Sequence, residues 1–238
     1  MTGDSNNSTK GLRSLIRGAR FVLFDFDGPI CRLFAGRSAA LVARQQVEWL
    51  EEQGLHGLLA NGVRDDPDPH SVLRAVDLRH PDSDLVVELE ELLTHEELKA
   101  VVSAWPTAYA DALIRTWTAT GARLAIATNN SPLVAVSYLT HRGLIECFHP
   151  HIYGRTQNLH LLKPDPYCVV RAVKALGAEP SRTLMIGDTP SDYLAARAAG
   201  VSFLGYARNE RKKQRLWAAG VRTIVPSLRP VLDLVRDG

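Results

Sequence analysis

The sequence predicts an α/β protein in which a doubly wound parallel sheet carries an inserted helical segment. Apolar runs rich in strand-forming residues alternate with helical patterns, and this alternation is typical of a parallel sheet covered by helices. A second observation is that residues 31–106, which follow the first apolar run, have a helical pattern. The predicted strands are 21–25, 123–128, 149–153, 183–188 and 201–206, and the helices between them include 132–142, 166–176 and 190–199.

The first twenty residues are predicted to form a leader that is disordered or loosely packed on the rest of the protein. Residues 1–9 are polar, and basic side chains then recur at helical spacing beside Leu12, Leu15 and Ile16. A short basic amphipathic helix of this kind can in principle lie on a membrane surface. We favour the loosely packed leader, because so short an apolar stripe binds weakly.

The inserted segment is predicted to be mainly helical. Apolar residues recur at helical spacing in its first part, and turn-forming residues separate the helices. Thr94 and Glu97 have the spacing of a capping box, which predicts that another helix begins there, and Pro106 ends or kinks it. The earlier predicted elements are a helix at 37–53, a loop at 64–69 and a helix at 70–79.

Two carboxylates end the first predicted strand. Because side chains alternate along an extended chain, Asp25 and Asp27 are expected to point to the same side, and Gly28 then allows a sharp turn. Paired carboxylates can hold a hard cation such as Mg²⁺, or can divide the roles of nucleophile and acid/base between them. The alternative is a polar strand end followed by a turn.

A hydroxyl group ends the next long strand. Thr128 follows the apolar run, Ser131 stands at the cap position of the next helix, and Pro132 suits its first position. Unpaired backbone N–H groups at this helix start, together with the Thr128 hydroxyl, predict an anion site. The alternative is that Thr128 merely ends a strand.

A lysine and two further acids stand at comparable positions. Lys163 comes just before a helix capped by Asp165, although a lone lysine is usually a solvated surface charge. Asp188 ends another apolar run, and Thr189 with Asp192 has the spacing of a capping box, so capping is an alternative role for Asp192. In sheets of this kind ligands bind beyond the carboxyl ends of the strands. The polar strand ends are therefore expected to share one site.

Composition argues against several classes of protein. No stretch is apolar enough to span a bilayer, no secretory leader is visible, and the three cysteines form no C-x-x-C pair, so we expect reduced thiols in a cytoplasmic protein. Motifs of P-loop proteins, zinc proteases and serine hydrolases are absent. The net charge is only +2, and we interpret the basic run 208–215 as a solvated helix rather than a nucleic-acid site.

Taken together and in this order, the polar segments resemble the four motifs of the haloacid dehalogenase superfamily, in its phosphatase-like branch. The matching segments are Asp25-Phe26-Asp27-Gly28, Thr128-Asn129, Lys163-Pro164 and Gly187-Asp188 followed by Asp192. The resemblance covers roughly residues 20–30 and 107–207. It implies a Rossmann-like catalytic core formed by 21–30 and 107–238, with strand 21–25 between the other two motif strands, and a helical cap formed by 31–106.

One residue departs from the family pattern. Where the family usually has threonine after Asp-Gly, this chain has Pro29. Proline has no hydroxyl and no backbone N–H, so residue 29 cannot donate the hydrogen bonds that threonine would give to this turn.

The resemblance implies a Mg²⁺-dependent phosphatase that hydrolyses a small phosphorylated metabolite through an aspartyl-phosphate. Asp25 is the implied nucleophile, and Asp27 the implied acid and base for the leaving alcohol and the water. The implied protein ligands of Mg²⁺ are Asp25, Asp188 and the main-chain carbonyl of Asp27. Charge neutralisation by the metal is needed because the attacking carboxylate and the phosphate repel each other.

The remaining motif residues are implied to bind and orient the phosphate. Thr128, the backbone N–H of Asn129 and the Lys163 ammonium would hold its oxygens, and Asp192 would orient Lys163 or the water shell of the metal. A sugar phosphomutase of the same superfamily is the alternative enzyme, and a catalytically idle binding or regulatory protein is a second alternative. The presence of both Asp25 and Asp188 argues against the idle protein.

The substrate contacts are expected in the cap. Arg32, Phe34 and Arg37 follow the catalytic loop directly and are the candidates. Because arginine suits a second anionic group, a phosphocarboxylate such as phosphoglycolate is the predicted type of substrate. Neither a nucleic acid nor a membrane is an expected partner, and the oligomeric state is not predicted.

Overall fold

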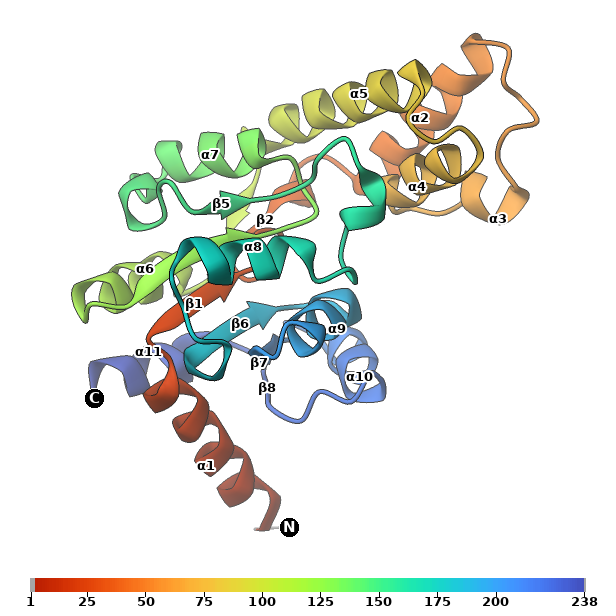
Figure 1. Ribbon diagram of the computed structural model, residues 1–238. Helices are drawn as coiled ribbons and strands as arrows, with labels where there is room; N and C mark the ends of the chain where they lie inside the picture. The colour runs from red at the N-terminus through yellow and green to blue at the C-terminus, as the bar shows by residue number, and fades with distance from the viewer. Residues whose placement is uncertain (1–2, 238) are drawn as a thin grey trace.

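A six-stranded parallel sheet forms the centre of the computed structural model, which describes residues 3–237 (Figure 1). The strand order is β5-β4-β1-β6-β7-β8, so β1 lies between β4 and β6, as the family resemblance implies. All of the strand pairs in this sheet are parallel, which confirms the predicted fold class. The strands are β1 (Phe21–Phe24), β4 (Arg123–Ala127), β5 (Ile152–Tyr153), β6 (Thr183–Gly187), β7 (Ser202–Tyr206) and β8 (Ile224–Val225).

Helices cover both faces of this sheet. Val22 and Phe24 of β1 point to one face and Leu23 to the other, because side chains alternate along a strand. The first face is covered by α1 (Gly3–Gly18), α6 (Ala110–Ala119), α7 (Pro132–His141) and α11 (Arg229–Arg236), and the second by α8 (Tyr167–Ala175) and α9 (Pro190–Ala198). The remaining helix beside the sheet is α10 (Glu210–Ala218), and short 3₁₀ turns occur at Ile145–Cys147, Leu159–Leu161 and Pro180–Arg182.

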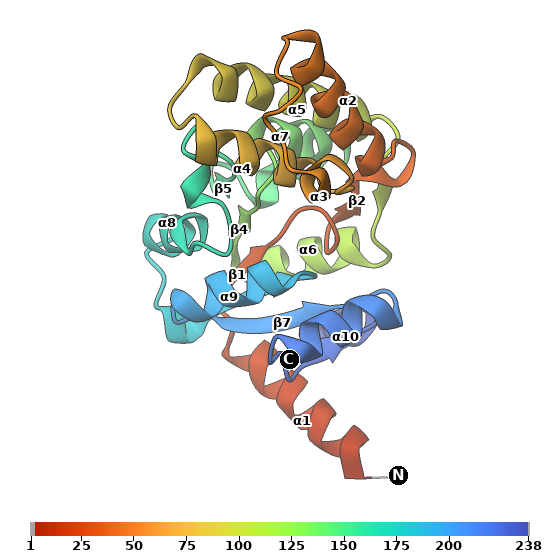
Figure 2. The same cartoon turned by 90° about the vertical axis from the view of Figure 1, so that its right-hand side faces the viewer.

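A second, purely helical layer lies above the carboxyl ends of the strands (Figure 2). The chain enters it through β2 (Cys31–Arg32) and leaves it through β3 (Trp105–Pro106), which pair as a short antiparallel ribbon. Its elements are a 3₁₀ turn (Leu33–Ala35), α2 (Ala39–Glu52), α3 (Asn61–Arg64), α4 (Pro69–Arg79) and α5 (Asp84–Val101). Side chains of α2, α4 and α5 form a hydrophobic cluster of their own, which Leu159 and Leu162 join from the core. The inserted segment is therefore a packed helical unit.

Residues 10–18 of the leader are not loosely packed, which corrects the expectation from sequence for this part of the chain. Residues 3–18 form the continuous helix α1, while residues 1–2 lie outside the described part of the chain. Leu12 and Ile16 are buried in the core cluster, where α1 contacts α11. The apolar stripe is short, but it packs on α11 rather than remaining in water. Within residues 3–237 the structure contains no helix that is both long and apolar enough to cross a bilayer.

The predicted helix start at Thr94 is wrong. The helix α5 begins at Asp84, with Ser83 at its cap position eleven residues before Thr94, and it runs through Thr94 without interruption. Leu89 and Leu93 keep the buried face of the helix continuous across this point. The Thr94 hydroxyl donates to Glu90 one turn earlier, and the Glu97 carboxylate binds partners in the core. Thr94 and Glu97 thus have the spacing of a capping box, but their side chains form hydrogen bonds with Glu90 and Arg155 instead of with each other's backbone.

Candidate active site

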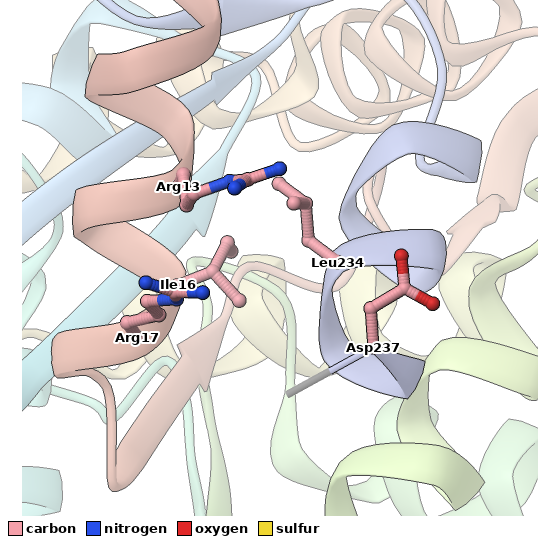
Figure 3. Close-up of a pocket in the computed structure, with 5 residues that line it drawn as sticks. All are labelled: Arg13, Ile16, Arg17, Leu234 and Asp237. Atoms are coloured by element: carbon pink, nitrogen blue, oxygen red, sulfur yellow. The ribbon is translucent and has the colours of Figure 1, made fainter.

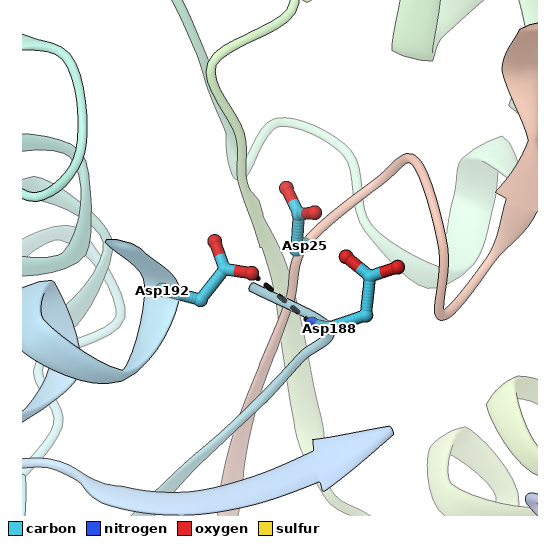
Figure 4. Close-up of side chains that lie close together, drawn as sticks. All are labelled: Asp25, Asp188 and Asp192. Atoms are coloured by element: carbon cyan, nitrogen blue, oxygen red, sulfur yellow. Dashed lines mark hydrogen bonds between the residues drawn. The ribbon is translucent and has the colours of Figure 1, made fainter. Parts of the chain in front are cut away.

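Three carboxylates meet beyond the carboxyl ends of β1 and β6. Asp25 follows β1, and its backbone N–H donates to the carbonyl of Ile186 on the neighbouring strand, at 2.9 Å. Asp188 follows β6, and Asp192 lies in the first turn of α9. Figure 4 shows the three side chains converging, and each offers an oxygen within 4.8 Å of the others. All three are buried, so this is a concentrated negative charge away from water.

Lys163 is a buried partner of this cluster and not a solvated surface charge. Its ammonium donates to Asp25 at 2.8 Å, to Asp192 at 2.5 Å and to the carbonyl of Ala127 at 2.9 Å. Burial by itself would lower the pKa of this lysine, but the Asp192 and Asp25 carboxylates outweigh it and raise the pKa. The ammonium therefore stays charged and joins the ends of β1, β4 and α9.

Asp192 performs both of the roles considered from sequence. One of its oxygens accepts from the backbone N–H groups of Asp188 and Thr189, at 3.1 and 3.0 Å, and so completes the capping box at the start of α9. The other oxygen accepts from Lys163. Capping thus orients the carboxylate toward the lysine.

The carboxyl groups of Asp25 and Asp27 have different surroundings. Burial and the repulsion of Asp192 raise the pKa of Asp25 to about 6, against the attraction of Lys163. Burial also raises the pKa of Asp27, although the Leu33 N–H donates to its Oδ1 at 2.9 Å and opposes the shift. The Asp27 side chain lies outside the three-carboxylate cluster. The environment therefore already distinguishes the two groups.

The turn that contains Pro29 is closed by hydrogen bonds from other residues. Gly28 N–H donates to Cys31 O at 2.6 Å, and the Thr107 hydroxyl donates to Gly28 O at 2.5 Å. Gly28 has φ +132°, and a Cβ atom there would lie 2.3 Å from an oxygen of Asp188. Only glycine fits at this position, and the missing hydroxyl of residue 29 does not leave the turn open.

The turn after β4 is held from several sides. The Thr128 hydroxyl lies 3.1 Å from Asn130 Oδ1, and the Asn129 side chain clamps the backbone of Lys163 through Oδ1, at 2.8 Å, and Nδ2, at 3.1 Å. The Ser131 N–H, expected to be free for an anion, instead donates to the Glu97 carboxylate at 3.1 Å. That part of the predicted anion site is wrong, because a carboxylate of the chain itself occupies the helix start.

Arg155, which the sequence analysis missed, is the fully buried centre of a polar network between the helical layer and the core. It donates to both oxygens of Glu97 at 2.9 and 3.0 Å, to Glu90 at 2.9 Å and to the carbonyl of Asn129 at 3.1 Å. The same carbonyl lies 3.1 Å from His70 Nε2 of α4. Burial by itself would raise the pKa of Glu97, but the attraction of the facing Arg155 guanidinium holds this pKa below its usual value. An isolated arginine gives no signal of this in a sequence.

A match to a family model agrees with this geometry. The model of haloacid dehalogenase-like hydrolases matches residues 19–200, which span all four polar segments and the inserted helices. The chain belongs to the haloacid dehalogenase-like hydrolases. The resemblance seen in the sequence is thereby confirmed.

Individual relatives in this family and a solved structure are similar to this chain. A phosphoglycolate phosphatase of Rhodospirillum rubrum is 30% identical over 200 residues, which cover 79% of this chain and 80% of the relative. A phosphoglycolate phosphatase of Agrobacterium fabrum is 26% identical over 186 residues, covering 77% and 78%. The crystal structure of a predicted phosphatase from Clostridium acetobutylicum superposes with a TM-score of 0.66 at 18% identity, covering 92% of this chain and 98% of that one. This last similarity supports the fold of the hydrolase.

The three residues predicted to contact substrate have other partners in this structure of the hydrolase. The Arg37 guanidinium pairs with Glu96 and also donates to Gln45 at 3.1 Å. The guanidinium carbon of Arg32 lies 5.2 Å from the centroid of the Trp105 ring. Phe34 packs against the hydrophobic clusters of both the core and the helical layer. These residues therefore line the connection between the two parts of the chain, and their contact with a substrate stays a prediction.

A second lysine reaches the carboxylates and was missed from sequence. Lys212 of α10 forms an ion pair with Asp188, although it belongs to the run 208–215 that we interpreted as a solvated helix. That interpretation is wrong for this residue, because α10 packs beside α9 and β7 and directs Lys212 toward the carboxyl ends of the strands. The spacing of basic residues alone does not show this direction.

The donor set suits a divalent cation. The two carboxylate oxygens of Asp188 are buried and, apart from the ion pair with Lys212, accept no hydrogen bond within the described residues. Oxygen atoms of several carboxylates are the ligands that hard divalent cations prefer. The cluster is therefore a fitting site for a divalent metal in this hydrolase.

A pocket elsewhere is not part of the site. It lies between α1 and α11 and is lined by Arg13, Ile16, Arg17, Leu234 and Asp237 (Figure 3). Because α1 leads into the amino end of β1, this pocket lies away from the carboxyl ends of the strands, and none of its residues belongs to the four motifs.

Proposed function

We propose that this hydrolase is a Mg²⁺-dependent phosphatase that acts on a small phosphorylated metabolite of the phosphoglycolate type through an aspartyl-phosphate. The observation that carries the proposal is the meeting of Asp25, Lys163 and Asp188 beyond the ends of adjacent strands, with Thr128 at the next strand end. The names of the related phosphoglycolate phosphatases support the class of substrate.

The nucleophile in this proposal is the Asp25 carboxylate. Its oxygen forms the new bond to phosphorus while the ester P–O bond breaks in line with it. Asp25, Asp188 and the main-chain carbonyl of Asp27 would hold Mg²⁺. When bound, the metal neutralises charge between the carboxylate and the phosphate.

Asp27 moves the proton in both half-reactions. Because Leu33 N–H donates to Oδ1, the transferable proton is assigned to Oδ2. The raised pKa of Asp27 favours the protonated form needed to protonate the leaving oxygen. The resulting carboxylate then takes a proton from the water that hydrolyses the aspartyl-phosphate.

Lys163 and the turn after β4 hold the phosphate oxygens. The Lys163 ammonium already lies at hydrogen-bond distance from Asp25, so a phosphate attacked by Asp25 comes within its reach. The Thr128 hydroxyl and the Asn129 backbone N–H bind from the neighbouring strand end. Asp192 keeps the lysine in place through its second oxygen. The Lys163 ammonium is thus held before substrate arrives, and such preorganisation is the basis of electrostatic stabilisation.

A panel of phosphorylated metabolites that includes 2-phosphoglycolate and sugar phosphates tests the proposal. We expect release of inorganic phosphate that requires Mg²⁺ and is abolished by Asp25→Asn. Acid quenching during turnover of a ³²P-labelled substrate should trap label on the wild-type chain and none on Asp25→Asn. Movement of label between two sugar positions without phosphate release would indicate a phosphomutase instead. No turnover of any phosphate ester would overturn the proposal.

A further inference from the structure

The carboxylate cluster contains two internal cations with different partners. Lys163 contacts Asp25 and Asp192, whereas Asp188 has Lys212 as its ionic partner and accepts no other hydrogen bond within residues 3–237. The Asp188 side chain is only 1% exposed. Removing a carboxylate from water is strongly unfavourable unless a counter-charge compensates it. Lys212 is therefore the residue that makes an ionised Asp188 tolerable in the metal-free protein.

The position of Lys212 depends on the start of α10. Its backbone N–H donates to the side chain of Asn209 at 2.9 Å, which caps the helix, and Leu216 one turn later is fully buried. The backbone of Lys212 is thus fixed, while its side chain remains 27% exposed. A long flexible side chain with access to solvent can leave Asp188 without any change in the helix.

We propose that Lys212 is a positioning residue of the metal site: its ammonium holds Asp188 in the metal-free protein and is displaced when a divalent cation binds. The inference rests on the metal site of the proposed function. An ammonium and a divalent cation compete for the same carboxylate oxygens, so only molecules in which Lys212 has left are ready to bind metal. The apparent affinity falls by the fraction of such molecules.

The arrangement has a second consequence for the shape of the site. Three carboxylates with oxygens within 4.8 Å of one another repel, and Lys163 compensates only two of them directly. With Lys212 in place, Asp188 stays beside Asp25 before the metal arrives. The metal ligands are thus assembled before the metal binds. The affinity for the metal is lower as a result, because the cation has to displace Lys212.

The decisive test is titration of MgCl₂ into the metal-free full-length protein by calorimetry. Lys212→Met should bind Mg²⁺ about tenfold more tightly, as expected if Lys212 occupies Asp188 in about nine molecules of ten. Lys213→Met is the matched control, because this neighbouring lysine is 57% exposed and, among the described residues, pairs only with Glu210 one turn away. It should bind Mg²⁺ like the wild type. Lys212→Arg keeps the charge and should not show the tighter binding.

A second readout is the melting temperature of the metal-free proteins. Lys212→Met should unfold at a lower temperature than Lys213→Met without metal, and the difference should disappear in saturating Mg²⁺. In the wild type, the ¹⁵N resonance of the Lys212 ammonium, assigned by its loss in Lys212→Arg, should shift or broaden when Mg²⁺ is added. This measurement does not depend on the folding of a Met variant.

The outcomes separate this inference from the proposed function. Equal Mg²⁺ affinity of Lys212→Met and Lys213→Met, or an unchanged Lys212 resonance in wild-type protein that binds Mg²⁺, would overturn the inference and leave the metal site intact. If the wild type binds no divalent cation at all, the metal assignment is wrong and the inference is overturned with it.

Discussion

Replacing Arg155 should show how strongly the buried network joins the helical layer to the core. In Arg155→Met the stem of the side chain remains, but the guanidinium that contacts Glu97, Glu90 and the carbonyl of Asn129 is lost. The Glu97 side chain is 0% exposed, so its charge cannot be hydrated where it lies. We expect a large loss in the free energy of unfolding.

The size of the loss follows from what remains around Glu97. Removing one partner of a buried ion pair costs about 3–5 kcal/mol. Glu97 keeps its hydrogen bonds from Asn130 Nδ2, at 2.9 Å, and from Ser131 N–H, at 3.1 Å, which places the expected loss near the lower limit. For a chain of this length, about 3 kcal/mol lowers the melting temperature by about 6–12 °C.

The matched control is Arg142→Met on the surface. Arg142 pairs with Asp111, but the two side chains are 42% and 26% exposed. Exposed pairs of this kind contribute at most about 1 kcal/mol. Guanidinium unfolding of both variants, followed by circular dichroism, compares the same residue change in a buried and an exposed pair.

A second variant tests the cause of the loss. Glu97→Gln in the Arg155→Met background removes the charge that has lost its partner, so the double variant should be more stable than Arg155→Met alone. Equal losses for Arg155→Met and Arg142→Met, or no recovery in the double variant, would refute the reasoning from an uncompensated buried charge.

Four further outcomes are expected. Asp27→Asn should lower turnover by about 10²–10⁴-fold, and less for aryl than for alkyl phosphates, because a good leaving group needs no proton; steady-state rates on both esters check this, and equal losses would contradict the role of Asp27. Gly28→Ala should weaken Mg²⁺ binding in calorimetry, since its Cβ would lie 2.3 Å from an Asp188 oxygen; wild-type affinity would argue against this crowding. Excess chelator should abolish phosphate release and added Mg²⁺ restore it, whereas full activity in chelator would exclude the metal. The pKa of Glu97 in the folded protein lies below the unfolded value of 4.5, so its ionised form stabilises the protein above that pH, and this contribution is lost as pH falls through the lower, folded pKa. The unfolding free energy of Glu97→Gln should therefore vary less with acid pH than that of the wild type. Identical pH profiles of the two proteins would contradict the lowered pKa of Glu97.

Local sequence patterns predicted five of the six strands of the sheet and their shared edge, whereas the two-residue strand β8 was not predicted. Each of Asp25, Thr128 and Asp188 directly follows an apolar run, and parallel strands necessarily bring such ends together. The place of Lys163 in the site was implied only by the combination of motifs, because a single lysine before a helix has no pattern of its own, and its burial was not predicted. The pattern of apolar runs that end in polar residues is thus enough to predict which strand ends form the site.

The residues missed from sequence are those whose partners lie far along the chain. Glu97 and Thr94 have capping-box spacing, yet Glu97 binds Arg155, which is 58 residues away. Lys212 lies in a run of exposed charges, and only the packing of α10 beside α9 directs it toward Asp188. Such contacts depend on tertiary packing, which residue spacing within one segment does not describe.

The ribbon of β2 and β3 has a consequence for how the protein can change over evolution. Cys31 pairs with Pro106, and Arg32 with Trp105, so the inserted helices leave and rejoin the core at neighbouring backbone positions. Insertions between adjacent points on a fold are well tolerated, and the entropy of closing a loop grows only slowly with its length. The helical layer can therefore change in length while the strands that precede Asp25 and Asp188 keep their order, provided that the buried contacts of Arg155 with Glu97 and Glu90 are kept.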